Sequence, residues 1–437
     1  MKHNEDSFSM ANSAMDFCRR AFKIPRSIVA KGNLESLEVL ESFLDPSLIH
    51  LDIPSGYDFN GWTVPNEWNL ISASLITPQG EELINLNSSN LYVVVGSNSV
   101  ESTLKLVDLL NHIHTRPDLP EAIPYVTMYY GDSWGICLPY SVVSRLSEGE
   151  YKVKILSSSP PGFMRLGEIF IEGKQKKEIF LSTYFCHPQM ANNELSGPAV
   201  WMVLANHLWK KAMAGELNYS YRLYIGPETI GAIHYLNLRK QELVQNVQAG
   251  FVLTCVGVNS NLVFMPSRSG LTLADRVLEH ILAEQKYERS NFKLRGSDER
   301  QWCSPAVNLP ICSLMTKKYH DYPEYHTSLD NLEFISIEGF EKIISLYLSI
   351  IDLLEKNLTF LNENLGEPKL DSIGLYPIVN KDGNSSHLYV RNILNILNML
   401  DGEIDTLMIS ETLGLDFDEV FTVLKILHTN GIISLCD

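Results

Sequence analysis

The chain has 437 residues, of which 45% are hydrophobic and 20% are charged, so it can build a sizeable core and is not disordered as a whole. Its 35 Lys and Arg residues against 52 Asp and Glu residues give a formal net charge of -17. An acidic surface repels phosphate backbones, which argues against nucleic acid as a partner. No stretch approaches the roughly 18 consecutive apolar residues that a membrane span needs, which argues against a membrane protein.

Two further features indicate the compartment. The first thirty residues contain no continuous apolar segment of the kind that a secretory signal needs. The seven cysteines stand far apart in the sequence and form neither a CxxC pair nor an even-numbered framework. The sequence therefore predicts a cytoplasmic protein with reduced thiols.

The first 175 residues contain two predicted helices followed by a strand-rich region. Apolar residues recur at helical spacing over residues 8–24 and 34–46. Residues 52–65 are rich in Pro, Gly and aromatic side chains, which is typical of a turn-rich connection. Residues 70–175 show mainly short strand patterns, with one predicted helix at 100–114.

Strand and helix patterns alternate from residue 177 onward. This alternation, with strands that are apolar throughout, predicts an α/β fold in which helices flank a mixed sheet. The β-rich stretch before it is then either a separate domain or an insertion whose flanks rejoin the core. The predicted strands are 178–185, 221–226, 251–256 and 309–315, and the predicted helices are 195–213, 229–244 and 335–357.

The last fifty residues resemble a winged helix-turn-helix that follows a linker over 366–386. Between 385 and 437 stand two basic residues, Arg391 and Lys425, and eight acidic ones, an unfavourable balance for a DNA reader. We expect this part to contact a protein partner or a second copy of the chain, with DNA as the alternative. Its predicted helices cover 388–400, 406–412 and 418–428, with a turn at Gly414 and a wing that opens at Asn430.

These patterns predict three domains. An α/β core combines residues 1–70 and 175–365, and an inserted β-rich domain covers 71–174. The winged helix covers 385–437.

Polar residues follow several predicted strands, and strand ends are where α/β proteins carry their sites. His187 is followed by Asn193 and Glu194, and His326 is followed by Asp330. A lone histidine at a strand end is more often structural than a ligand, but two in this context favour a site. Neutral imidazole with oxygen ligands suits catalytic zinc with one position open for water.

Two more segments add charged groups to this set. Glu228 follows a predicted strand in Gly226-Pro-Glu228, and Asp298 stands two residues before Arg300. In order and spacing, the segments resemble the zinc aminopeptidase family with a phosphorylase-like α/β fold, which includes secreted bacterial aminopeptidases and relatives of glutamate carboxypeptidase. The matching positions are His187, Asn193-Glu-Leu-Ser-Gly197, Glu228, Ser297-Asp298 and Tyr325-His-Thr-x-x-Asp330.

More closely, the whole chain resembles bacterial aminopeptidase-like proteins catalogued as a domain of unknown function. Those proteins place a small β domain inside the peptidase core and a winged helix at the end. The resemblance implies a metal-dependent aminopeptidase or a related amide hydrolase that acts on a small peptide or amide. It also implies zinc ligands drawn from His187, Asn193, Glu194, Glu228 and His326.

Further roles follow from the same resemblance. Glu228 is the expected general base, and Asp298 is a second catalytic candidate that can draw a substrate amino group. Asp330 is expected to accept the ring N–H of His326 and fix its tautomer. Arg300 and Tyr325 are expected to bind substrate, while the alternative for the Asp298–Arg300 segment is an internal ion pair. His320 is a competing metal ligand.

Three departures from the family pattern reduce the expected number of metal ions. The bridging Asp of the family falls at Asn193, and its paired glutamates become Pro227-Glu228. The Asp expected near the 251–256 strand is Cys255, which is either a thiolate ligand or a buried apolar thiol. We therefore expect one zinc ion rather than two. The alternative is a catalytically degenerate binding or regulatory module whose winged helix mediates protein contacts.

Overall fold

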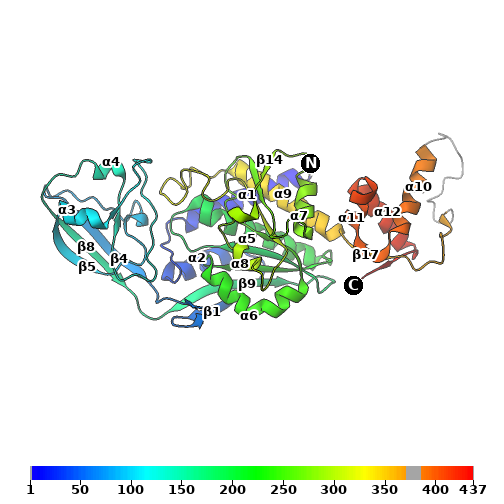
Figure 1. Cartoon of the computed structure of the whole chain (residues 1–437), viewed down its shortest axis with the longest axis horizontal. Helices are drawn as coiled ribbons and strands as arrows, with labels where there is room; N and C mark the ends of the chain where they lie inside the picture. The colour runs from blue at the N-terminus through cyan, green and yellow to red at the C-terminus, as the bar shows by residue number, and fades with distance from the viewer. Residues whose placement is uncertain (1, 371–384, 437) are drawn as a thin grey trace. The chain divides into compact units, whose positions relative to one another are not determined.

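The computed structural model describes residues 2–370 and 385–436, which form two compact units that divide between Leu348 and Ser349 (Figure 1). Most of the linker predicted over 366–386 lies outside these described residues. In the described part, no helix is both long and apolar enough to cross a membrane. All seven cysteines are free thiols. The cytoplasmic location stays a prediction.

A mixed eight-stranded sheet forms the centre of the first unit. Its middle strands β11, β10, β12 and β15 run parallel, while β9 and β1 add antiparallel strands at one side. β13 pairs antiparallel with β15, and β14 follows it. In sheet order the strands are β1 (Ile49–Pro54), β9 (Phe163–Ile171), β11 (Ser220–Gly226), β10 (Glu178–Tyr184), β12 (Val247–Val252), β15 (Ile311–Met315), β13 (Leu262–Met265) and β14 (Tyr287–Arg289).

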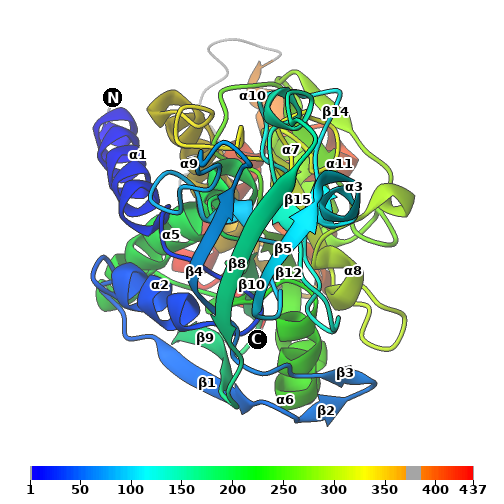
Figure 2. The ribbon, with the colours of Figure 1, turned by 90° about the vertical axis from the view of Figure 1, so that its left-hand side faces the viewer.

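Helices cover both faces of this sheet, as Figure 2 shows with α1 and α5 on one side and α6 and α8 on the other. Side chains alternate along a strand. Phe180 and Ser182 of β10 therefore share a face, and both contact Trp302 of α8 (ring centroids 5.1 Å; Nε1 to Ser182 Oγ 3.1 Å). The helices are α1 (Lys2–Ala21), α2 (Lys31–Glu41), α5 (Ser196–Met213), α6 (Ile230–Asn246), α7 (Leu273–Ile281), α8 (Glu299–Trp302) and α9 (Ile337–Lys356).

A buried ion network ties the first half of β11 to its neighbours. Arg222 donates to Glu178 on β10 at 2.7 and 3.0 Å and to Glu168 on β9 at 3.1 Å. Arg239 of α6 donates to the same Glu168 at 3.0 Å. Both carboxylates are only 2% exposed, so their charges depend on these partners.

A separate three-stranded antiparallel sheet, in the order β4-β8-β5, packs its own apolar core around Leu75, Val153 and Ile155. Its strands are β4 (Asn69–Ile76), β5 (Val100–Lys105) and β8 (Glu150–Ser158). Short elements complete this region and its approaches: β2 (Asp58–Phe59), β3 (Trp62–Thr63), η1 (Asn90–Tyr92), α3 (Leu106–Leu109), η2 (Leu110–His112), β6 (Ile113–His114), β7 (Ile136–Cys137) and α4 (Tyr140–Val143). β9, although within 71–174, belongs to the large sheet.

The prediction of a helix over 100–114 is wrong for residues 100–105. Residues 100–105 form strand β5, in which half-buried and exposed positions alternate, and only Leu106–Leu109 is α-helical. Val100 and Leu104 both pack against the core of the small sheet. Because they are four residues apart, their spacing fits a period of two as well as a helical turn. The α/β fold class and the mixed sheet flanked by helices are confirmed.

The second unit contains the winged helix. Its sheet has the order β17-β16-β18, and Gly414 ends α11 in the left-handed conformation at φ 63°. Asp405 and Asp416 cap α11 and α12, since their side chains accept the backbone N–H of Met408 (2.7 Å) and Glu419 (3.0 Å). The elements are β16 (Thr359–Leu361), α10 (Ser385–Asn398), β17 (Asp401–Asp405), α11 (Thr406–Leu413), α12 (Phe417–Thr429) and β18 (Ser434–Leu435).

Candidate metal centre and active site

The candidate site lies where three neighbouring parallel strands end. Cys186 and His187 follow β10, Glu228 follows β11, and Cys255 follows β12. Parallel strands present their carboxyl ends at the same edge of a sheet, so these residues converge although they are far apart in sequence. The candidate site therefore lies at the carboxyl edge of the central parallel strands.

A single π-helical turn, η3 (Ala191–Leu195), brings Asn193 and Glu194 to this edge immediately before α5. Asp330 fixes the turn: its carboxylate accepts the backbone N–H of Asn192 at 2.6 Å and of Asn193 at 3.0 Å. It also accepts the hydroxyl of Tyr322 at 3.1 Å. The carboxylate that we expected to orient His326 is therefore engaged with the backbone of η3 instead.

Three potential ligand groups cluster tightly at this edge: Cys186, His187 and Glu194, whose ligand atoms all lie within 4.8 Å of one another. Cys186 Sγ lies 3.4 Å from His187 Nδ1 and 3.9 Å from Glu194 Oε1, and the His187 ring contacts that carboxylate directly. All three residues are buried, and Glu194 Oε2 has no hydrogen-bond partner. A bound cation would satisfy this buried carboxylate oxygen.

His326 completes the set of imidazoles. Its ring centroid is 4.9 Å from that of His187, and the edge of the Tyr125 ring packs against both. Nε2 of His326 is buried without a partner. Burial, followed by the nearby His187, lowers the pKa of His326 to about 2, so the ring is neutral and free to act as a ligand.

The protonation of the site depends on its buried acids. Burial disfavours the charged form of His187, but the Glu194 carboxylate outweighs it and raises the pKa of His187 above its ordinary value. Burial raises the pKa of Glu228 to about 7. Burial, followed by Glu228, raises the pKa of Asp298 well above its ordinary value. A carboxyl group that titrates near neutral pH suits general acid–base work.

A cavity of about 220 Å³ opens beside this cluster. His187, Glu228 and Arg300 supply its charged groups, and aromatic rings supply much of the rest of its wall. Its size fits one amino-acid side chain or a small amide. The lining residues are Ile28, Trp62, Tyr129, Tyr130, Cys186, His187, Glu228, Thr229, Ile230 and Arg300.

The remaining predicted site residues lie at different depths. Asp298 is fully buried and accepts the backbone N–H of Thr229 at 2.7 Å. Arg300 lines the cavity and donates to the Thr229 hydroxyl at 2.5 Å. This hydrogen bond stands in place of the ion pair that we considered within the Asp298–Arg300 segment. The Tyr325 ring stacks on that of His326, with centroids 3.9 Å apart. His320 is exposed and packs against Tyr325.

Several residues of the site were missed by the sequence reasoning. Cys186 directly precedes His187, so a Cys-His pair at a strand end was the available signal. Arg26 donates to the carbonyl of His187 at 3.0 and 3.2 Å from 161 residues away. Tyr125 and Tyr129, linked through their hydroxyls at 2.7 Å, approach from the β-rich region. No local pattern could have revealed these last three.

Left-handed backbone is concentrated around the site. Four non-glycine residues with positive φ adjoin it: Gln189 at 48°, Thr229 at 67°, Cys255 at 54° and His326 at 54°. Such conformations cost about 1–3 kcal/mol each and persist where the surrounding structure fixes them. They collect at functional sites more often than elsewhere, which supports a functional role for this edge of the sheet.

The donor set includes groups that suit a metal ion. Imidazole, carboxylate and thiol groups meet there with three buried atoms that have no hydrogen-bond partner, Asn193 Oδ1, Glu194 Oε2 and His326 Nε2. On the far side, Asn193 Nδ2 points to the thiol of Cys255 at 3.9 Å. Burial raises the pKa of Cys255 to about 12. Asn193 and Cys255 thus contribute a neutral amide and a thiol to this side of the site.

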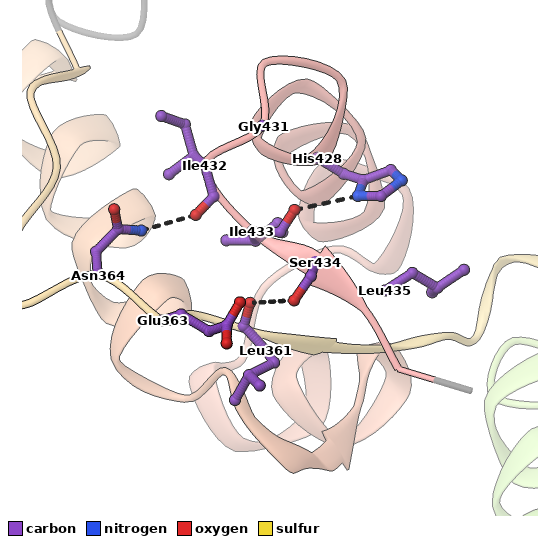
Figure 3. Close-up of a pocket in the computed structure, with 9 residues that line it drawn as sticks. All are labelled: Leu361, Glu363, Asn364, His428, Gly431, Ile432, Ile433, Ser434 and Leu435. Atoms are coloured by element: carbon purple, nitrogen blue, oxygen red, sulfur yellow. Dashed lines mark hydrogen bonds between the residues drawn. The ribbon is translucent and has the colours of Figure 1, made fainter.

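A second hollow, of about 640 Å³, lies on the winged helix (Figure 3). Two backbone carbonyls of the wing accept hydrogen bonds there. The Asn364 side-chain amide donates to the carbonyl of Ile432 at 2.7 Å, and Nδ1 of His428 lies 3.2 Å from the carbonyl oxygen of Ile433. Among the lining residues drawn in Figure 3, Glu363 is the one that is acidic. Among the described residues, no group of three or more His, Cys, Asp or Glu side chains that could hold a metal ion lies there.

The fold and the site together define an aminopeptidase-like domain with a C-terminal winged helix. Residues 15–357 match the family model described as "Domain of unknown function (DUF4910)", and the chain belongs to this family. Residues 358–435 match a winged helix-turn-helix model. The expected resemblance to aminopeptidase-like proteins is thereby confirmed.

Known relatives agree with this assignment. The chain is 34% identical over 423 residues to a Clostridium acetobutylicum protein described provisionally as a polysaccharide biosynthesis protein with an aminopeptidase-like domain, covering 96% of this chain and 95% of that one. A crystal structure of a provisionally named peptidase from the same organism superposes with a TM-score of 0.87 at 32% identity, over 99% of this chain and 98% of that one.

More distant structures share the fold of the first unit. The zinc aminopeptidase BSAP of Bacillus subtilis superposes with a TM-score of 0.54 at 14% identity, over 78% of this chain and 94% of that one. An M28 peptidase precursor from Shewanella amazonensis also superposes with a TM-score of 0.54, at 13% identity, over 80% of this chain and 96% of that one. At these identities the likeness concerns the fold alone.

Proposed function

We propose that this protein is a metal-dependent aminopeptidase or related amide hydrolase that binds one zinc ion and acts on a small peptide or amide. One observation carries the proposal. His187, which contacts the buried Glu194 carboxylate with its unpartnered oxygen, lines a cavity that Glu228 also lines. A metal ligand set beside an acid that titrates near pH 7 is what hydrolysis by activated water requires.

Each residue has a role in this proposal. A bound zinc ion supplies polarisation of the scissile carbonyl and a lowered pKa for its water. Its ligands are drawn from His187, Asn193, Glu194, Glu228 and His326. The Glu228 carboxylate accepts the proton of the attacking water and returns it to the leaving amine, which a pKa of about 7 allows at neutral pH.

Neighbouring groups position the substrate. Arg300 lines the cavity and is the group that binds a substrate carboxylate. Asp298 lies behind Thr229, so it acts through Glu228 and that loop rather than by direct contact with substrate. Tyr325 holds the His326 ring by stacking. A cavity of about 220 Å³ restricts the substrate to a small group next to the scissile bond.

The first test measures the metal content of protein purified without added metal, for wild type and His187→Ala. His320→Ala is the matched control, since His320 is a nearby exposed histidine outside the cluster. We expect about one zinc ion per chain in wild type and in His320→Ala, and a loss of zinc in His187→Ala. Hydrolysis is then screened with aminoacyl amides and short peptides, and Glu228→Gln is expected to remove turnover while it keeps the fold.

A second candidate function is a degenerate peptidase that binds its ligand without hydrolysis. Asn193 and Pro227 favour it, because both occupy positions where the resembled family has carboxylates. This candidate predicts no turnover across the whole screen, while zinc-free protein still binds a small amide. Turnover of any one substrate that disappears in Glu228→Gln would exclude it.

For the winged helix we propose a protein partner or a second copy of the chain. Three acidic residues, Asp416, Asp418 and Glu419, stand at the start of α12, where a DNA-reading helix would meet phosphate. The partner would therefore present a basic surface to this end of α12. Retention of the protein on DNA at about 0.15 M salt, where exposed charges are screened over about 8 Å, would contradict this assignment.

A further inference from the structure

Cys186 lies inside the ligand cluster, although the roles proposed above give it no part. Its Sγ atom is 3.4 Å from His187 Nδ1 and 3.9 Å from Glu194 Oε1. In a tetrahedral zinc site with Zn–N and Zn–O bonds of about 2.0–2.2 Å and Zn–S bonds of about 2.3 Å, neighbouring ligand atoms stand roughly 3.2–3.8 Å apart. The Cys186–His187 distance falls within this range and the Cys186–Glu194 distance lies just above it. The direct contact between His187 and Glu194 is shorter than such an edge, so these two groups have to move apart when an ion binds.

We propose that Cys186 binds the metal ion as a thiolate, together with Nδ1 of His187 and the carboxylate of Glu194. The centre is then a mononuclear site with one sulfur, one nitrogen and one oxygen ligand, and His326 or Glu228 stands next to its open position. This inference rests on the proposed function in that it concerns the same metal site.

Charge balance supports the assignment. A Cys186 thiolate and a Glu194 carboxylate carry two negative charges, and neutral His187 adds none, so a divalent ion leaves the buried centre without net charge. Without the thiolate, the ion and these ligands would carry one net positive charge, which the neighbouring Glu228 carboxylate would have to balance. The thiol proton leaves to solvent when the ion binds, so atoms and charges balance.

Burial, followed by the carboxylates of Glu194 and Glu228, raises the pKa of the Cys186 thiol well above its ordinary value, and two nearby groups act in the opposite direction. The backbone N–H of Glu228 donates to Cys186 Sγ at 3.4 Å. The buried Arg26 guanidinium, which donates to the carbonyl of His187, adds a positive charge on the same side. Glu194 is 0% exposed and its Oε2 has no partner, an independent sign that a cation belongs between these groups.

Two readouts that do not depend on turnover test the inference. Cobalt(II) bound to the metal-free full chain is expected to show sulfur-to-cobalt charge-transfer absorption in the near ultraviolet. Cys186→Ser is expected to lose that band. Its zinc affinity should fall by more than the roughly 10–100-fold that is lost when a residue that only orients a metal ligand is changed. Cys255→Ser is the matched control, since it removes the other buried thiol at this edge, and it is expected to keep the band.

Zinc K-edge X-ray absorption on the wild-type zinc complex decides the point even if Cys186→Ser does not fold. One sulfur neighbour at about 2.3 Å is expected. A zinc shell of nitrogen and oxygen alone would overturn the inference, and so would failure to bind either ion. A cobalt band that survives in Cys186→Ser, or that disappears in Cys255→Ser, would overturn it as well. The hydrolysis screen is separate: a sulfur-ligated ion without turnover would reject the proposed function and leave this assignment standing.

Discussion

Gly197, the second residue of α5, provides a test of how closely the helix must approach the strand ends that carry the site. A Cβ atom added there would lie 2.2 Å from the carbonyl oxygen of Leu253 and 2.5 Å from Thr183 Oγ1. Ordinary contact begins at 3.4 Å, so the helix and the segment after β12 would have to separate by about 1.2 Å. The added methyl would also enter the Thr183–Leu253 hydrogen bond of 2.9 Å.

We expect Gly197→Ala to lower the free energy of unfolding by about 2–4 kcal/mol. Overpacking contributes about 1–3 kcal/mol of this loss, and the lost hydrogen bond contributes about 1 kcal/mol. Because α5 continues from the turn that carries Glu194, zinc affinity should fall as well. The measurements are urea denaturation of metal-free protein and competition for zinc with a chelator of known affinity.

Gly215→Ala is the control for this substitution. Gly215 has a φ of +70° and nothing within 4 Å of an added Cβ, so only the left-handed backbone is penalised, by about 1–2 kcal/mol. Its zinc affinity should match that of wild type. Stability within about 0.5 kcal/mol of wild type for Gly197→Ala, with unchanged zinc binding, would refute the close-approach argument.

Three further predictions concern charged groups. In metal-free protein, Glu194→Gln should lower the pKa of His187, because that carboxylate is what raises it; an unchanged NMR titration of the ring would contradict the pairing. Arg222→Met should cost about 3–5 kcal/mol in urea denaturation, because its carboxylate partners on β9 and β10 stay buried without it, and it should leave zinc content unchanged. Glu228 has a folded pKa of about 7 against an ordinary 4.5, so the folded state binds this proton more tightly. Its contribution to the stability of metal-free protein should fall as pH rises from about 4.5 to 7 and level off above; a pH profile in which Glu228→Gln keeps the same slope would argue against this.

The α/β class and the winged helix could be predicted because their signals are local. Apolar strands such as β10 and β11 and the helices between them leave periodic patterns, and the turn at Gly414 needs a residue that adopts positive φ at little cost. The segment at 100–114 could not be resolved the same way. Val100 and Leu104 satisfy two periods at once, and only the pairing of β5 with β8 decides between them.

The residues of the candidate site were partly visible in the sequence by itself, since His187, Glu194, Glu228 and His326 follow predicted elements. Tertiary structure alone decided how they are connected. Asp330 binds the turn before α5, where it accepts two backbone N–H groups that the start of a helix leaves without helical partners. Cys186 and Arg26 joined the site only when parallel strand ends and a distant loop came together, and such proximity leaves no periodic trace in a sequence.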